Sequence, residues 1–142
     1  MKTNIIIKKV WEDDISAEFN IKFETSVNFE NFVVSGNFYL SDGKTFKKLY
    51  EALACGEGVV VFNGVDNNFC ELTISKNVTG LRNIHYHLFM VEQNLNKNDG
   101  CDISINTGYI VDPAVIDRNM QRLCNFYNEP EGSKISLGYI QE

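Results

Sequence analysis

The stretch Ser41–Ser75, SDGKTFKKLYEALACGEGVVVFNGVDNNFCELTIS, decides most of the fold. Apolar side chains recur at helical spacing in its first part. The side-chain oxygens of Ser41 and Asp42 can accept hydrogen bonds from the free N–H groups of a first helical turn. We therefore predict an amphipathic α-helix over Lys44–Ala54, whose apolar face, which includes Leu53, is buried.

The rest of the stretch predicts two strands joined by a turn. Gly56 can adopt the left-handed backbone conformation that closes a helix, and Val59–Phe62 is a β-branched and aromatic run typical of a buried strand. Turn-forming residues follow at 64–68. In Cys70–Ser75 apolar and polar side chains alternate, which indicates a strand with one buried and one exposed face.

Similar patterns predict the other elements of the chain. Gly36 predicts a bulge or bend in its strand, and the polar run Gln93–Gly100 predicts a loop. Asp112 and Pro113 are typical of a helix start, and apolar spacing extends this second helix over Pro113–Tyr127. The remaining predicted strands lie at or begin at Ile5–Ile7, Ala17–Glu24, Phe32–Leu40, Leu81–Val91, Cys101–Ile105 and Ile135–Ile140.

These elements predict the fold class. The helices are few and successive strands are joined by short turns, which favours antiparallel pairing over alternating parallel units. We therefore predict an α+β fold, with a mainly antiparallel curved β-sheet packed with two α-helices. With 142 residues, 44% of them hydrophobic and 12% aromatic, the chain fits a single domain, residues 1–142, with one core.

The charge balance limits the classes of partner. The chain has 19 acidic and 13 basic residues, a formal net charge of −6. Binding to a nucleic-acid backbone requires clustered Lys or Arg, so we expect no nucleic-acid partner. The excess of acid suits a basic protein partner. The alternative is that the charge only keeps a small domain in solution.

The cysteines and the N-terminus predict the compartment. Cys55, Cys70, Cys101 and Cys124 are too far apart for the paired spacing of a zinc site and lie in apolar patterns, so we expect buried free thiols. The N-terminus lacks the apolar region of a signal peptide, and no stretch approaches the roughly 20 apolar residues of a membrane span. We expect a cytoplasmic protein without membrane contact.

The two histidines, His85 and His87, are the candidates for metal chemistry. In a strand both side chains project from the same face, and Glu71 and Thr73 on a neighbouring strand could approach them. Two ligands do not form a metal site and no spacing supplies a third, so we favour a structural or partly exposed role. The sequence contains no known catalytic motif. We expect no enzymatic activity, no metal and no cofactor.

Two groups of acidic and polar residues are candidates for contact with a basic partner. One group lies around the strand predicted at Ala17–Glu24, and the other lies in and after the polar loop. Clusters of this kind can steer a basic protein into contact, and the alternative is an ordinary solvated face. The candidate contact residues are Glu12, Asp13, Asp14, Glu18, Glu24, Asn96, Asp99 and Asp102.

The order of these motifs resembles that of small bacterial immunity proteins. An alternating strand is followed by an F-x-G-type strand, the helix TFKKLYEAL, the strands VVFNG and FCELTIS, and a G-x-x-x-I strand at Gly80–Ile84. Over roughly Phe19–Val91 the pattern is similar to the WapI-like group and, more loosely, to contact-dependent growth-inhibition immunity proteins. The resemblance implies a protein that binds a cognate toxin domain, often a nuclease, and blocks it inside the producing cell. It supplies no functional residue.

Two functions follow as hypotheses. The first is an immunity protein that neutralises a toxin domain, in particular a nuclease, by forming a stoichiometric complex. The alternative is a β-rich module without catalysis that encloses a small apolar ligand, with Phe32, Phe38, Tyr86 and Phe89 as candidate lining. Aromatic residues in a sheet of this size are more often part of the core.

Overall fold

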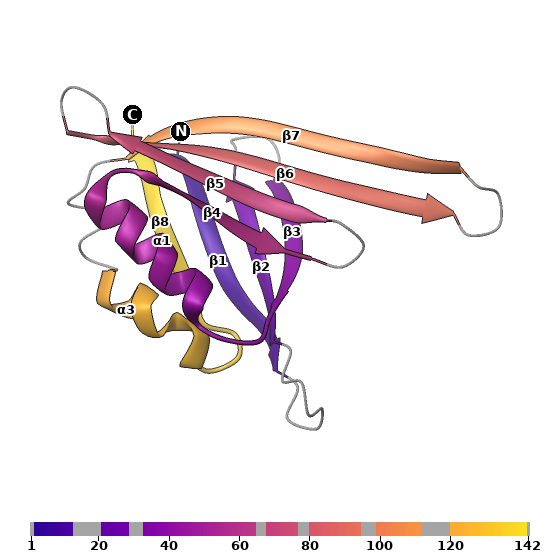
Figure 1. Ribbon diagram of the computed structural model, residues 1–142, viewed down its shortest axis with the longest axis horizontal. Helices are drawn as coiled ribbons and strands as arrows, with labels where there is room; N and C mark the ends of the chain where they lie inside the picture. Colours follow the sequence, from indigo (N-terminus) through magenta and orange to yellow (C-terminus); the bar gives the residue numbers. More distant parts are fainter. Residues whose placement is uncertain are drawn as a thin grey trace.

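The structure, a computed structural model, describes residues 2–12, 21–28, 33–64, 68–76, 80–94, 99–111 and 120–141 (Figure 1). For residues 2–4, 11–12, 28, 34, 91–94, 99–103, 105, 107–109, 111, 120–121 and 138–141 it describes the backbone alone. The strands are β1 (Lys2–Glu12), β2 (Ile21–Asn28), β3 (Val33–Leu40), β4 (Gly58–Asn63), β5 (Phe69–Lys76), β6 (Arg82–Asn94), β7 (Asp99–Val111) and β8 (Lys134–Gln141). The helices are α1 (Lys44–Cys55), α3 (Met120–Asn125) and the short 3-10 helix η1 (Phe126–Asn128).

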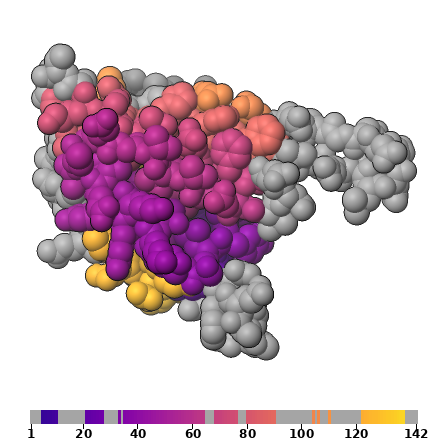
Figure 2. Space-filling view, viewed as in Figure 1, coloured from indigo at the N-terminus to yellow at the C-terminus, as the bar shows by residue number. Residues whose placement is uncertain are grey.

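The strands form two four-stranded antiparallel sheets. Sheet A has the order β3-β2-β1-β8 and sheet B has the order β4-β5-β6-β7. Helices α1 and α3 contact each other and lie side by side at one side of the two sheets (Figures 1 and 2). The predicted α+β class with mainly antiparallel pairing is confirmed, although the strands are divided between two sheets instead of forming one.

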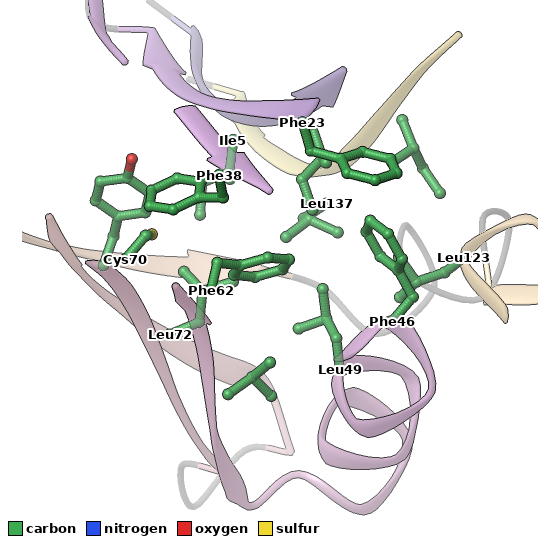
Figure 3. Close-up of a cluster of buried hydrophobic side chains, with 14 of the residues drawn as sticks. Ile5, Phe23, Phe38, Phe46, Leu49, Phe62, Cys70, Leu72, Leu123 and Leu137 are labelled. Carbon is green, nitrogen blue, oxygen red and sulfur yellow. The ribbon is translucent and has the colours of Figure 1, made fainter. Parts of the chain in front are cut away.

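The core lies between the inner faces of the two sheets and α1. Figure 3 shows Phe38 of sheet A and Phe62 of sheet B between the sheets, with Phe46 and Leu49 projecting from α1 toward them. The ring centroids of Phe38 and Phe62 are 6.0 Å apart, and those of Phe46 and Phe62 are 5.9 Å apart. All four side chains are buried. Burying one such side chain contributes about 1.5–3 kcal/mol to stability, so this cluster holds the three elements together.

Helix α1 confirms the prediction made for Lys44–Ala54, and Leu53 is buried. At its start, Asp42 Oδ1 accepts a hydrogen bond from the backbone N–H of Lys44 at 2.9 Å. At its end Gly56 is left-handed, with a φ of 86°. This conformation favours glycine and stops the helix before β4.

Arg82 fixes the end of α1 to sheet B. Its Nε and Nη2 atoms donate to the carbonyl oxygens of Leu53, at 2.9 Å, and Ala54, at 3.2 Å. The last carbonyls of a helix lack partners within the helix, so a cation there satisfies them and interacts favourably with the helix dipole. The sequence does not predict this contact, because Arg82 belongs to a strand well beyond the helix.

Strand β4 departs from the prediction of a fully buried strand. Val60 and Phe62 are buried, but the exposed fractions of Val59 and Val61 are 58% and 38%. Sheet B packs against the core on one side only, so successive side chains of its edge strand alternate between core and solvent.

The second predicted helix is confirmed over its last part. Residues 112–119 lie outside the described part of the chain, and α3 begins at Met120. From Phe126 the backbone changes to the 3-10 helix η1, a tighter form common at helix ends. Leu123 and Phe126 are buried in the core.

Gly36 does not mark a bulge, so this half of the prediction of a bulge or bend is wrong. The pairing of β2 with β3 runs through Gly36, opposite Thr25, without a shift in register. A Cβ atom at this position would lie 2.6 Å from Leu88 Cδ1 of the facing sheet. The glycine therefore suits the close approach of the two sheets, and only residues distant in sequence reveal this approach.

The predicted polar loop is shorter than expected. The β6–β7 ladder continues through Gln93 opposite Gly100 and Asn94 opposite Asp99, and residues 95–98 lie outside the described part. Backbone hydrogen bonds in a hairpin do not depend on apolar side chains, so a polar sequence can continue the ladder.

The predicted burial of the cysteines holds for Cys70 and fails for Cys55. Cys55 is exposed at the last position of α1, outside the apolar stripe of that helix, and Cys124 is half-buried. Cys70 lies beside a buried hydrogen bond of 2.9 Å between Thr25 Oγ1 and Tyr86 OH, which joins the two sheets. Burial raises the pKa of the Cys70 thiol to about 12.

Lys9 is a buried cation that links β1 to the C-terminal helices. Its side chain is 1% exposed, and Nζ donates to the carbonyl oxygens of Tyr127 at 2.9 Å and Glu129 at 2.7 Å. These carbonyls lie at the end of η1, where backbone acceptors lack helical partners. A sequence signal for its burial exists, because Lys9 shares the strand parity of the buried Ile5 and Ile7.

Candidate functional site

The outward-facing side of sheet B is the candidate functional surface. Alternate side chains of β4, β5, β6 and β7 point away from the core there, and Glu71 is the one charged residue among those whose side chains are described. Figure 2 shows atoms of β4, β5 and β6 gathered over the middle of the molecule. We define the sheet B outer face as Val59, Val61, Asn63, Phe69, Glu71, Thr73, Ser75, Asn83, His85, His87, Phe89, Ser104, Asn106 and Ile110.

Strand register places the two histidines at the centre of this face. His87 lies opposite Glu71 of β5 and Asn106 of β7, and His85 lies opposite Thr73. The predicted approach of Glu71 and Thr73 to the histidine strand is therefore confirmed. Both imidazoles are on the same face, as the spacing of two residues in a strand requires.

A row of hydrogen bonds joins the histidines to β7. His85 Nε2 lies 3.2 Å from Asn106 Oδ1, an amide oxygen that can only accept, so this imidazole donates. His87 Nε2 lies 3.0 Å from Ser104 Oγ, and Asn106 Nδ2 donates to the same oxygen at 3.5 Å. These contacts orient both rings at the surface. The sequence could not predict Ser104 and Asn106, because their part in the row depends on the β6–β7 register.

Aromatic rings border the histidines on the other side. The rings of Phe69 and Phe89 stack with centroids 5.4 Å apart, and the edge contact of Phe69 with His87 has a centroid distance of 5.3 Å. Phe69 and Phe89 are half-buried, so each exposes part of an apolar ring, and His87 beside them is also half-buried. Val61 and Ile110 add exposed aliphatic surface at the two edges of the sheet.

The described groups around the histidines supply part of a catalytic arrangement. The contact of Ser104 with His87 has the spacing of a nucleophile and its base, but catalysis also needs a group that orients the imidazole. No described carboxylate hydrogen-bonds to either imidazole. No cluster of three or more metal-ligating His, Cys, Asp or Glu side chains is found among the described residues.

Sheet A places Glu24, the one predicted contact residue whose side chain is described, among lysines. Glu24 of β2 lies opposite Lys8 of β1, and Lys8 lies opposite Lys134 of β8. Lys22 projects from the same side of β2. The acidic surface predicted around Glu24 is therefore interrupted by cations from strands distant in sequence.

The other predicted contact residues lie elsewhere or outside the described part. Asp99 and Asp102 lie in the first part of β7. The β6–β7 ladder continues there beyond the end of β5, whose last pair with β6 is Phe69 with Phe89. The structure thus separates them from Glu24, which belongs to the other sheet. Glu12 is the last residue of β1. The positions that are not described are Asp13, Asp14, Glu18 and Asn96.

A hollow of about 450 Å³ lies between the start of α1 and the α3–η1 segment. Its lining includes Asp42, Lys44 and Lys47 from the start of α1 and Cys124 and Tyr127 from the other side. The charged side chains at the hollow are one aspartate and two lysines, all exposed to solvent.

The aromatics considered as lining for an apolar ligand do not form one cavity. Phe38 and Tyr86 are buried in the core, whereas Phe89 lies on the sheet B outer face. Phe32 lies outside the described residues.

Comparison with family models, with curated proteins and with solved structures finds no match to this chain. Among the described helices, none has both the length and the apolar character needed to cross a membrane.

Proposed function

We propose that this protein is a cytoplasmic immunity protein that binds and neutralises a cognate bacterial toxin domain, in particular a nuclease, by stoichiometric complex formation and without catalysis. The observation that carries the proposal is the sheet B outer face. The centres of protein interfaces are depleted in charge and enriched in aromatic side chains. Phe69, Phe89 and His87, flanked by Val61 and neutral polar groups, have this composition.

The charge of the chain supports a basic partner. Nuclease domains hold phosphates on basic surfaces, and a protein of net charge −6 is attracted to such a surface. Docking on a face with one described charged residue, Glu71, limits the cost of desolvating buried ions. The complex would therefore form in two steps, long-range attraction by acidic residues outside the contact and then burial of the sheet B outer face. The motif order that resembles the WapI-like group supports the immunity class.

The test is co-expression with the toxin domain that the adjacent upstream gene is expected to encode at the end of a large secreted protein. A stable one-to-one complex and protection of cells that produce the toxin are the expected results. Added salt should lower the association rate more than it raises the dissociation rate, because steering acts on the encounter. Absence of both binding and protection would contradict the proposal.

A matched pair of variants locates the contact. Val61 on the sheet B outer face and Tyr39 on the opposite, sheet A side of the molecule have nearly equal exposed fractions, 38% and 37%. We expect Val61→Asp to weaken toxin binding by roughly 10- to 100-fold, because a charge would be buried in the contact, and Tyr39→Asp to leave it nearly unchanged. A larger loss of binding in Tyr39→Asp than in Val61→Asp would place the contact on sheet A instead.

A further inference from the structure

The geometry points to a second contact made by sheet B: we propose that two copies of this chain pair through their β7 strands, antiparallel about a two-fold axis, so that the two B sheets join into one. Strand β7 is 13 residues long and stands at the edge of the sheet, paired with β6 alone. Its second edge therefore presents backbone N–H and C=O groups outside any ladder of the described strands, which is the usual template for addition of another strand.

The other sheet edges differ from β7. Strands β3 and β4, one edge from each sheet, contact each other, so each partly covers its neighbour. Strand β8 approaches the C-terminal end of β7, and the rest of β7 runs away from it (Figure 1). The longer part of the β7 edge is thus uncovered by any described element.

Beyond its acidic start, strand β7 also lacks the features that normally prevent edge pairing. Natural edges are protected by charged side chains, especially lysine, by proline or by a bulge. The segment Asp99–Val111 contains no lysine, arginine or proline. Its pairing with β6 continues without a register shift from Arg82 opposite Val111 to Asn94 opposite Asp99. The edge is therefore long, regular and without a cation.

The position of the acidic residues favours a second copy in antiparallel orientation. Asp99 and Asp102 both lie near the start of β7. In an antiparallel pair these two ends are far apart, whereas a parallel pair would place like charges side by side, which is destabilising. A two-fold axis presents the same strand from both copies, so each backbone group meets its complement. The described outer-face residues in the uncovered part of β7, Ser104 and Asn106, are uncharged and would border the joint.

The test measures self-association of the purified full chain by sedimentation velocity from micromolar to millimolar concentration. We expect a monomer–dimer equilibrium that strengthens with added salt, because both copies carry a net charge of −6. Ser104→Glu would place an acid in the uncovered part of β7, where the two-fold axis brings the two copies of the change close together, and raise the dimer Kd roughly tenfold.

Val59→Glu is the matched control. Val59 is exposed on β4, the opposite edge of the same face, and Ser104 is also exposed, so both variants should fold and carry the same added charge. We expect Val59→Glu to leave the dimer Kd nearly unchanged. Equal weakening by both variants would overturn β7 pairing in favour of face-to-face stacking. A monomer at every concentration would also overturn it.

Hydrogen exchange of the unmodified chain gives a reading without variants. Amide protection should rise with protein concentration in β7 and stay constant in β4; a rise confined to other strands would contradict the proposal. None of these measurements involves a toxin, so their outcome is independent of the proposed immunity function.

Discussion

Sheets A and B have the same number of antiparallel strands and both bury alternate apolar side chains, but their outer faces carry different chemistry. Lys8, Lys22, Glu24 and Lys134 project from sheet A, whereas Glu71 is the one charged residue described on the outer face of sheet B. Stability requires apolar side chains only on the inner faces, and surface positions are nearly neutral to stability. The low charge of the outer face of sheet B is thus not required by the fold, and this face is available for recognition.

The sheets also differ in regularity. Strand β1 of sheet A has register shifts between Ile5 and Ile6 and between Lys9 and Trp11. Lys9 lies at the second shift, where its backbone bonds to Gly132 and Ser133 and its side chain holds the end of η1. The pairings of sheet B show no shift over their described length. The irregular part of sheet A therefore contacts the C-terminal helices, whereas the described pairings of sheet B are regular throughout.

The largest expected effect tests the contrast between the inner and outer faces of sheet B. Phe62 is fully buried between rings of sheet A and α1, and its neighbour Val61 faces outward. Phe62→Ala should lower the free energy of unfolding by about 3–5 kcal/mol, because a cavity replaces the ring. Val61→Ala, its control, should cost less than about 1 kcal/mol in the same urea titration. Similar losses would mean that the two faces are misassigned.

A smaller effect tests how closely the inner faces approach each other. Gly36→Ala places a methyl group where Leu88 Cδ1 lies 2.6 Å away, so we expect a loss of about 1–3 kcal/mol by overpacking. The double variant with Leu88→Ala should lose less stability than the sum of the two single losses, giving a coupling energy in a double-mutant cycle of urea titrations. Strict additivity would show that the two residues do not meet.

The buried thiol of sheet B predicts a pH dependence. The pKa of the Cys70 thiol is about 12 in the folded protein and about 8.5 in the unfolded chain. As the pH rises, the unfolded chain therefore loses this proton first. The Cys70 contribution to stability is complete below pH of about 8.5 and then declines toward pH 12 by up to about 1.4 kcal/mol per pH unit.

Cys70→Val should remove this part of the alkaline slope in urea titrations. A thiol reagent supplies a second measurement, since exposed Cys55 should react with it in the native protein and Cys70 only after unfolding. An unchanged slope in Cys70→Val, together with rapid labelling of Cys70, would show that the thiol is accessible.

The smallest expected effect on stability compares the two outer faces directly. His87→Ala on sheet B and Lys22→Ala on sheet A should each change the free energy of unfolding by less than about 0.5 kcal/mol. Only His87→Ala should lower affinity for the toxin domain, because its ring and Phe69 form part of the proposed contact. Thermal unfolding and binding titrations on the same samples check both statements, and a loss of affinity in Lys22→Ala alone would reverse the comparison.

The sequence by itself determined the elements whose signals are local. Helix α1 follows from the spacing of Phe46, Leu49 and Leu53 and from Gly56, and β5 follows from strict alternation. The same-face placement of His85 and His87 follows from strand geometry alone. These features depend on residues within a few positions of one another, so one sequence suffices to predict them.

Only the tertiary structure decided how those elements meet. The division into two sheets, the close approach of a glycine to Leu88 and the lysines around Glu24 arise between residues distant in the chain. The candidate surface has the same origin, because register brings Ser104 and Asn106 of β7 to the histidines and Phe69 of β5 to their other side. Strand pairing is selected by the total apolar area buried on both inner faces. This area depends on the whole chain and cannot be calculated from any local stretch of sequence.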